Sequence, residues 1–114
     1  MLTPEQAKKW AADLRSGTYT QGRGKLLGES GQRCCLMVLA EGLGAKVTKD
    51  EYNRCKILIA DAEVVRELPN RGIAPLPESI MDRPTQRQFS GMNDGQALDF
   101  QEIATEVEKV FKLK

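Results

Sequence analysis

The sequence predicts a small α+β domain with three main helices, of which the second is a buried central helix, and with a short β-hairpin or irregular segment before the last helix. Three observations carry this prediction: a capping box near each end of the chain, an apolar run in the first half, and two β-branched runs in the middle. A wholly helical domain is the alternative. With 114 residues the chain has the length of one domain, so we expect residues 1–114 to form a single compact unit.

The first helix is expected at about residues 3–16. Thr3 is a suitable N-cap, Pro4 fits the first helical position, and Gln6 stands where a capping box needs it. Gly17 is expected to end the helix. The apolar residues that recur at helical spacing are Ala7, Trp10, Ala11 and Leu14. We therefore expect an amphipathic helix with Trp10 as its anchor.

A loop and then the central helix are expected next. Residues 18–30 are rich in glycine and polar residues, and two leucines among them can attach the loop to the core, so we expect it to be ordered. Every residue from Cys34 to Ala40 is apolar. Ser30 is a good N-cap, and Gly42 or Gly44 can end a helix, which predicts a helix at about residues 31–43. A helix that is apolar on every side must be covered on every side.

The middle of the chain carries the strand signals. Residues 56–60 and 63–66 are β-branched apolar runs that are separated by two residues, which favours a hairpin. The alternative is a continuous helix, because residues 50–67 contain neither glycine nor proline. Residues 85–91 are mostly polar and are interpreted as a connector, and the Asn-Asp-Gly sequence at 93–95 as a turn.

The last helix is expected at about residues 99–112. Asp99 and Glu102 have the spacing of a capping box, and Leu98 and Ile103 have that of a hydrophobic staple. The apolar stripe of this helix consists of Ile103, Ala104, Val107, Val110 and Phe111. This stripe can pack on the core of its own chain or on a second copy, so a monomer and a homodimer both remain open.

Composition limits the possible functions. The chain has 17 basic and 16 acidic residues and few aromatic ones, so we expect neither a nucleic-acid nor a membrane partner. No signal peptide or membrane anchor is recognisable, which predicts the cytoplasm. An odd number of cysteines fits reduced thiols. Histidine is absent, so the commonest general base and metal ligand are missing, and we expect no cofactor, no metal and no enzyme activity.

Three stretches together resemble a family of small uncharacterised proteins that tailed phages and prophages encode. The first has the pattern W-x3-LRSG-x-Y-x-QG-x-G from Trp10 to Gly24, and the second is the paired-cysteine run from Cys34 to Leu39. The third joins Met92-Asn93-Asp94 to the stretch from Phe100 to Ala104. The resemblance does not extend to residues 45–91, and Met37 stands where the family usually has glycine. It implies a phage or prophage origin, hence the host bacterial cytoplasm, and supplies no reaction.

A binding site is predicted around the loop at residues 18–30. Four cations and only one carboxylate occur between residues 15 and 33, and the loop leads into a helix N-terminus, which attracts anions. Lys25 is followed by leucine, so the Walker pattern fails. The candidate ligand- or partner-binding residues are Arg15, Tyr19, Gln21, Arg23, Lys25 and Arg33. In the alternative interpretation, Arg15, Tyr19 and Gln21 tie the loop to the core by hydrogen bonds.

The adjacent cysteines have two interpretations. Cys34 and Cys35 stand near a predicted helix start beside Arg33, a setting that can lower the pKa of a thiol and produce a nucleophile. Without histidine, however, the usual base is missing. The other interpretation is a pair of core thiols, because free cysteine is among the most buried residue types.

Three functions follow from these observations. The leading hypothesis is a phage accessory protein without enzyme activity that binds a host protein, for instance to counter a host defence or regulatory system. The second is capture of an anionic small molecule, such as a nucleotide or another phosphate-bearing ligand. The third is a hydrolase or transferase that uses Cys34.

Overall fold

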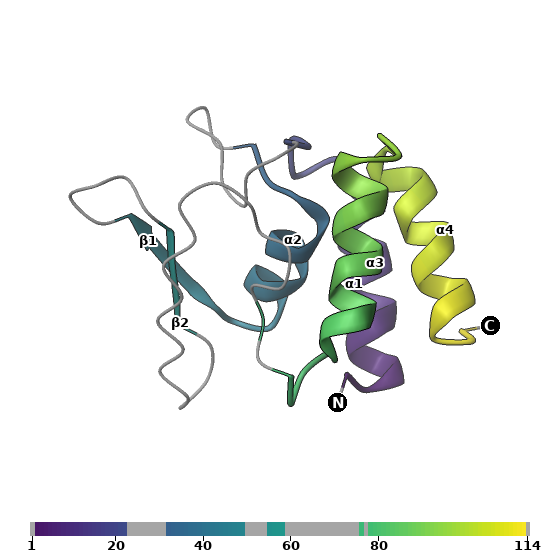
Figure 1. Cartoon of the computed structure of the whole chain (residues 1–114), viewed down its shortest axis with the longest axis horizontal. Coiled ribbons are helices and arrows are strands. Elements are labelled where there is room, and N and C mark those ends of the chain that lie inside the picture. The colour runs from purple at the N-terminus through teal and green to yellow at the C-terminus, as the bar shows by residue number, and fades with distance from the viewer. Residues whose placement is uncertain (1, 23–31, 50–54, 59–75, 77, 114) are drawn as a thin grey trace.

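Four helices dominate the computed structural model of this chain, which describes residues 2–22, 32–49, 55–58, 76 and 78–113 (Figure 1). The helices are α1 (Pro4–Arg15), α2 (Cys35–Gly42), α3 (Arg83–Asp94) and α4 (Phe100–Val110). Two short strands, β1 (Lys46–Lys49) and β2 (Cys55–Leu58), pair antiparallel. Among the described helices, none combines the length and the apolar character that crossing a membrane requires.

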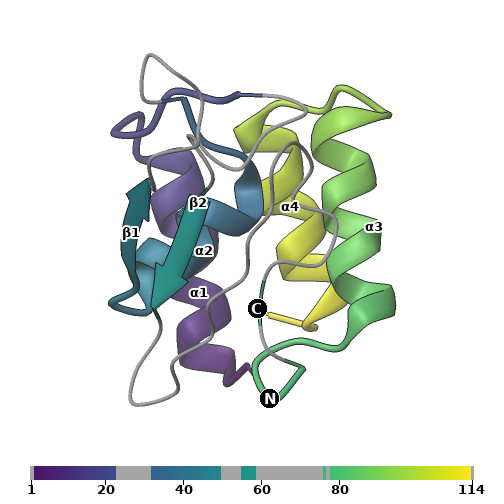
Figure 2. The same cartoon turned by 60° about the vertical axis from the view of Figure 1, so that its left-hand side comes forward.

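The four helices form a closed bundle. α1 packs on α2 and α4, and α3 packs on the same two helices. The β1–β2 ladder lies beside α2, on the side away from α4 (Figure 1), and the turned view in Figure 2 shows the ladder in front of α2 with α3 to its right. The bundle therefore brings the two ends of the described chain, α1 and α4, side by side.

The short helix α2 is the centre of the bundle. Its residues from Cys35 to Ala40 are all buried. The indole Nε1–H of Trp10 donates a hydrogen bond of 2.9 Å to the backbone oxygen of Cys35, which joins α1 to the first turn of α2. The prediction of a buried central helix is confirmed, although the helix begins at Cys35 and its N-cap is Cys34. The predicted cap, Ser30, lies outside the described residues.

Three aromatic rings join the other helices. Phe89 of α3 meets Trp10 of α1 edge-on, with ring centroids 4.8 Å apart, and stacks on Phe111 at 6.3 Å. Trp10 and Phe111 also meet edge-on, at 6.5 Å. Both arrangements are favourable for aromatic quadrupoles. The predicted anchor role of Trp10 is thereby confirmed: the residue is 1 % exposed, and its ring contacts α3 and the C-cap of α4 as well as α2.

The caps of α1 and α4 are as predicted. Thr3 and Gln6 form a reciprocal capping box at α1, and Asp99 and Glu102 form one at α4. Gly17 follows the end of α1 with a φ of +77°, a conformation that glycine adopts without steric cost. These local signals were sufficient to predict the helix ends, because each of them satisfies backbone groups of its own helix end.

α4 ends in a Schellman motif. The backbone N–H of Leu113 donates to the oxygen of Glu108 at 2.8 Å, and that of Lys112 donates to the oxygen of Lys109 at 3.3 Å. This arrangement requires a left-handed residue at position 112, where φ is +53°. The side chain of Leu113 is half-buried against the core.

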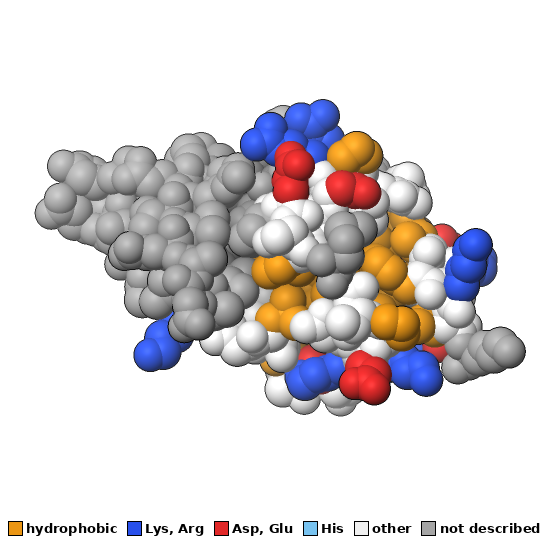
Figure 3. All heavy atoms as spheres, turned by 90° about the horizontal axis from the view of Figure 1, so that it is seen from below, with side chains coloured by type: hydrophobic (Ala, Val, Ile, Leu, Met, Phe, Trp, Pro, Cys, Tyr) orange, Lys and Arg blue, Asp and Glu red, His pale blue; other side chains and the backbone are white. Residues whose placement is uncertain are grey.

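The end of the bundle that holds the start of α1 and the end of α4 shows apolar side chains among charged ones (Figure 3). Leu2, Val110, Phe111 and Leu113 are half-buried and pack against the core. Because they are attached to the core, these residues complete the bundle at this end.

The predicted α+β class is wrong, because the regular elements of the described residues are four helices and only one short two-stranded ladder. The predicted hairpin of residues 56–60 with 63–66 is not supported: the described strand Cys55–Leu58 pairs with the earlier segment Lys46–Lys49, and Val47 stands opposite Ile57. Gly44, whose φ is +87°, turns the chain after α2 and makes this earlier partner available. Residues 59–66, which include the predicted second strand, lie outside the described part.

A fourth helix, α3, occupies the predicted connector at residues 85–91. Its N-cap is Asp82, which accepts a hydrogen bond from the backbone N–H of Thr85 at 2.8 Å. The sequence did not predict this helix, because its buried face carries polar residues and so lacks the apolar periodicity of an amphipathic helix. These residues are Gln86, Ser90 and Asn93. The predicted turn at residues 93–95 is the last turn of α3 and its C-cap.

Candidate functional site

Two segments that lie ten residues apart in the sequence meet beside α2. Gln21 and Arg33 form a parallel β-bridge, in which the backbone N–H of Gly22 donates to the oxygen of Arg33 at 2.8 Å. The N–H of Arg33 donates to the oxygen of Thr20, also at 2.8 Å. We call residues 20–22 and 32–33 the stem, because they join the two ends of the segment 23–31.

Gly22 allows the two arms of the stem to approach closely. A Cβ atom at this position would lie 2.8 Å from the Cβ of Gln32, a distance that real side chains do not tolerate. Moving the arms apart to make room for a Cβ would lengthen the two 2.8 Å hydrogen bonds between them. A glycine is therefore required here for close approach of the backbone.

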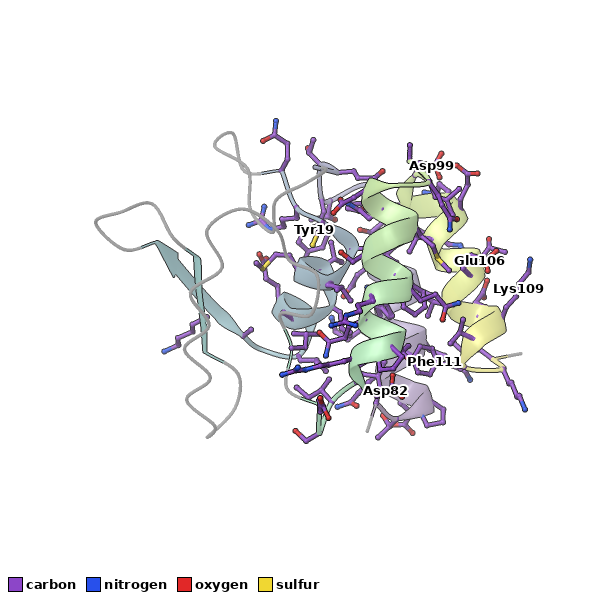
Figure 4. The ribbon with its side chains drawn as sticks, in the orientation of Figure 1. Tyr19, Asp82, Asp99, Glu106, Lys109 and Phe111 are labelled. Carbon is purple, nitrogen blue, oxygen red and sulfur yellow. The ribbon has the colours of Figure 1, made fainter. Side chains whose placement is uncertain are left out.

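Arg33 and Tyr19 form an ordered pair on the stem. The guanidinium carbon of Arg33 lies 5.6 Å from the centroid of the Tyr19 ring, within the range of a cation–π contact. Arg33 Nε donates to Glu41 Oε1 of α2 at 2.5 Å, and the two side chains are 28 % and 20 % exposed. Figure 4 shows Tyr19 far from Phe111 and Asp82, which lie toward the other end of the bundle. The pair thus presents a cation and an aromatic ring in fixed positions.

Asn93 attaches the stem to the helices. Its Oδ1 accepts hydrogen bonds from Gln21 Nε2 at 3.0 Å and from the backbone N–H of Cys35 at 3.3 Å. Its Nδ2 donates to the oxygen of Gly22 at 2.9 Å and to Asp94 Oδ1 at 2.7 Å. Gln21 Nε2 also donates to the backbone oxygen of Leu98 at 2.7 Å. The stem, the start of α2 and the end of α3 therefore share one hydrogen-bond network, centred on the buried Asn93.

The predicted site residues do not all come together. Arg15 contacts α4: its guanidinium donates to Thr105 Oγ1 at 3.3 Å and to Glu108 Oε1 at 2.5 Å. The hydrogen bond from Arg15 lowers the pKa of the Glu108 carboxyl below its usual value. Arg15 and Arg33 are thus paired with carboxylates on different helices.

The structure brings Tyr19, Gln21 and Arg33 together at the stem. The predicted tie of the loop to the core by hydrogen bonds is observed for Gln21, whereas Arg15 ties α1 to α4. Arg23 and Lys25 lie outside the described residues and stay predictions.

The two adjacent cysteines, Cys34 and Cys35, are part of the core. Cys34 is 5 % exposed and Cys35 is fully buried. Burial raises the pKa of the Cys34 thiol to about 12 and also raises the pKa of Cys35 well above its usual value. Cys35 Sγ lies 3.4 Å from the backbone oxygen of Phe89, to which it donates. A thiol with a raised pKa stays protonated near neutral pH, which is the opposite of an activated nucleophile.

Sequence reasoning missed Asn93 and Glu41 as parts of this site. The Asn-Asp pair that belongs to the phage resemblance was the one available signal for Asn93. Within the residues that the structure describes, every buried side-chain nitrogen and oxygen has a hydrogen-bond partner. The same residues contain no group of three or more side chains placed to ligate a metal ion.

Comparisons with known proteins give one result. No curated protein and no solved structure matches the chain. The model of a protein family described as a domain of unknown function, DUF8296, matches residues 2–111. These residues include all four helices, both strands and the stem. The chain therefore belongs to the DUF8296 family.

Proposed function

We propose that this protein is a phage- or prophage-encoded accessory protein that acts in the host bacterial cytoplasm by binding a host protein. The origin rests on the resemblance of its three motifs to phage and prophage proteins. The mode of action rests on one observation: the stem presents Tyr19 and Arg33 as an ordered pair at the surface. A host defence or regulatory protein is the proposed class of target.

The Tyr19–Arg33 pair has the chemistry of a binding hot spot. Tyrosine and arginine are enriched among the residues that dominate protein–protein affinity. Fixing a flexible side chain on binding costs about 0.5–1.5 kcal/mol. Glu41 and the Tyr19 ring already hold the Arg33 side chain, so a partner would meet it with much of that cost removed. Both residues keep part of their surface open to solvent.

Two alternatives receive less support. A phosphate-bearing ligand would have to compete with Glu41 for Arg33, and Arg15 is engaged by Glu108 on α4. A nucleophilic role for Cys34 conflicts with the burial of its thiol and with its raised pKa. Binding of a host protein through the Tyr19–Arg33 pair requires neither the release of Arg33 from Glu41 nor the exposure of the Cys34 thiol.

The test is capture from a lysate of the bacterial host, using the tagged full chain and the variants Tyr19→Ala and Arg33→Lys. The matched control is Arg83→Lys, because Arg83 is exposed on α3 and is paired with Glu78 at 3.0 Å. We expect one host protein to be retained by the wild type and the control. Loss of a hot-spot contact weakens affinity by roughly 30-fold, which should abolish retention by the two site variants.

The thermal midpoint of each variant separates a lost contact from a lost fold. A captured protein that all variants retain equally would show that the pair is not the contact. Absence of any retained host protein would contradict the proposed function itself. A small molecule that is released on denaturation and lost with Arg33→Lys would favour ligand capture instead.

A further inference from the structure

We propose that Asn93 is the positioning residue of this site: it fixes the stem, and with it the Tyr19–Arg33 pair, to the helical core. The inference rests on the proposed function for one point only, namely that the Tyr19–Arg33 pair is the contact with the host protein. The position of the stem itself can be measured without any partner. The argument starts from the hydrogen-bonding capacity of the Asn93 side chain.

Asn93 uses its full capacity. An asparagine amide can donate two hydrogen bonds and accept two, and Asn93 makes four, with heavy-atom distances between 2.7 and 3.3 Å. The side chain is fully buried. A buried amide that loses its partners leaves polar groups unsatisfied, which costs more than a hydrogen bond contributes. The geometry around Asn93 is therefore strongly preferred over any displaced arrangement.

Asn93 contacts the chain on both sides of the segment 23–31. Before that segment it binds the Gln21 side chain and the oxygen of Gly22. After the segment it accepts from the N–H of Cys35, which lies two residues beyond Arg33. One side chain thus holds the first arm directly against the end of α3, and the second arm through the start of α2, into which that arm leads.

The contact with Cys35 also replaces a local cap. Cys34, the N-cap of α2, makes no side-chain cap hydrogen bond, so the first N–H of α2 depends on Asn93 for a side-chain acceptor. The start of α2 and the stem are consequently positioned by the same atom, Asn93 Oδ1.

The substitution Asn93→Asp separates positioning from packing. Aspartate has the same shape and keeps the Oδ1 acceptor for Gln21 and Cys35. It removes both donors and places a carboxylate oxygen against the oxygen of Gly22 and Oδ1 of Asp94. We expect the first arm of the stem to be released while the core keeps its volume.

Gln86 provides a matched control on the same helix. It is also a fully buried amide, and its Nε2 donates to the oxygens of Leu76 at 2.8 Å and Met81 at 2.7 Å. These contacts belong to the segment before α3 and not to the stem. Gln86→Glu makes the same chemical change as Asn93→Asp at a site of equal burial.

The experiment is amide hydrogen exchange by NMR on the ¹⁵N-labelled full chain. In Asn93→Asp we expect exchange of the Gly22 and Arg33 amides to become roughly tenfold faster or more, relative to Val107 in α4. In Gln86→Glu the ratio of stem to α4 exchange should stay at the wild-type value. The Nε–H signal of Arg33 should broaden in the first variant only, because it reports the contact with Glu41.

Equal acceleration of Gly22, Arg33 and Val107 in Asn93→Asp would overturn the inference, since it would indicate global destabilisation. If Asn93→Asp does not fold, Gln21→Met tests the same link from outside the helices. It removes the hydrogen bonds from Gln21 Nε2 to Asn93 Oδ1 and to the backbone oxygen of Leu98, and it should speed exchange at Gly22 and Arg33 alone. Unchanged exchange in Gln21→Met would then overturn the inference.

The two proposals fail separately. A positive exchange result with no captured host protein would leave Asn93 as the positioning residue and remove the proposed function. If a host protein is captured, Asn93→Asp should weaken its retention and Gln86→Glu should not. Equal retention by both variants would show that the stem need not be held in place for binding.

Discussion

Replacing Lys112 with glycine should stabilise the protein. Lys112 has a φ of +53° because the Schellman motif at the end of α4 requires a left-handed residue. The left-handed conformation costs an ordinary L-residue about 1–2 kcal/mol. Glycine avoids that cost, but it raises the conformational entropy of the unfolded chain, which lowers the stability by about 0.4–1 kcal/mol. The difference predicts a gain of about 0.5–1 kcal/mol in the free energy of unfolding.

The same exchange at Lys109 is the control. Lys109 lies inside α4, where glycine costs about 1 kcal/mol relative to a good helix former. Its pair with Glu106 at 3.5 Å is exposed and adds little. The two lysine-to-glycine substitutions, three residues apart, should therefore change the free energy of unfolding in opposite directions, with a difference of roughly 1.5–2 kcal/mol between them.

Urea unfolding followed by far-UV circular dichroism measures the change in the free energy of unfolding for both variants, provided that this free energy falls with urea concentration at the same slope in both. The thermal midpoint of Lys112→Gly should rise by about 2–5 °C. A loss of stability in Lys112→Gly, or equal losses in both variants, would refute the assignment of strain to position 112.

Three further predictions concern the stem, the thiols and the aromatic cluster. Gly22→Ala should lower the free energy of unfolding by about 1–3 kcal/mol, because the new Cβ would lie 2.8 Å from the Cβ of Gln32. The control Gly91→Ala should be neutral or stabilising, because no atom lies within 4 Å of the new Cβ. Equal effects of the two substitutions in urea unfolding would contradict this prediction. Stability should fall as pH rises above about 9, by about 1.4 kcal/mol per pH unit for each buried thiol, because the unfolded thiol ionises there and the folded Cys34 thiol, with a pKa of about 12, does not. Cys34→Ala should reduce this slope, and an unchanged slope would exclude the thiol as its source. Phe89→Leu should cost about 1–3 kcal/mol in the same unfolding assay, since the ring contacts with Trp10 and Phe111 are lost; a change below about 0.5 kcal/mol would show that the ring geometry contributes nothing.

Local sequence signals predicted α1 and α4 well because their capping groups and apolar stripes lie within each helix. Thr3 with Gln6 and Asp99 with Glu102 satisfy backbone groups of their own first turns. The apolar run from Cys34 to Ala40 predicted the central helix for a similar reason, since apolar character on every side requires burial wherever the helix lies.

The remaining features depend on contacts between distant residues. α3 has Gln86, Ser90 and Asn93 on its buried face, and polar residues at such positions hide the apolar periodicity. The start of α2 is capped from residue 93, which no local pattern can indicate. At the site, the motif around Tyr19 and Gln21 was visible in the sequence, but the pairing of Arg33 with Glu41 and of Arg15 with Glu108 required the fold.

The two buried amides of α3 also limit how this helix can slide and how its length can change. Gln86 and Asn93 lie two helical turns apart, and each depends on hydrogen bonds no longer than 3.3 Å. A shift of α3 by one turn, about 5.4 Å along its axis, would remove both amides from their partners at once. One inserted residue between them would rotate one amide by about 100° relative to the other. The spacing between positions 86 and 93 should therefore be invariant, whatever aliphatic substitutions the neighbouring core positions accept.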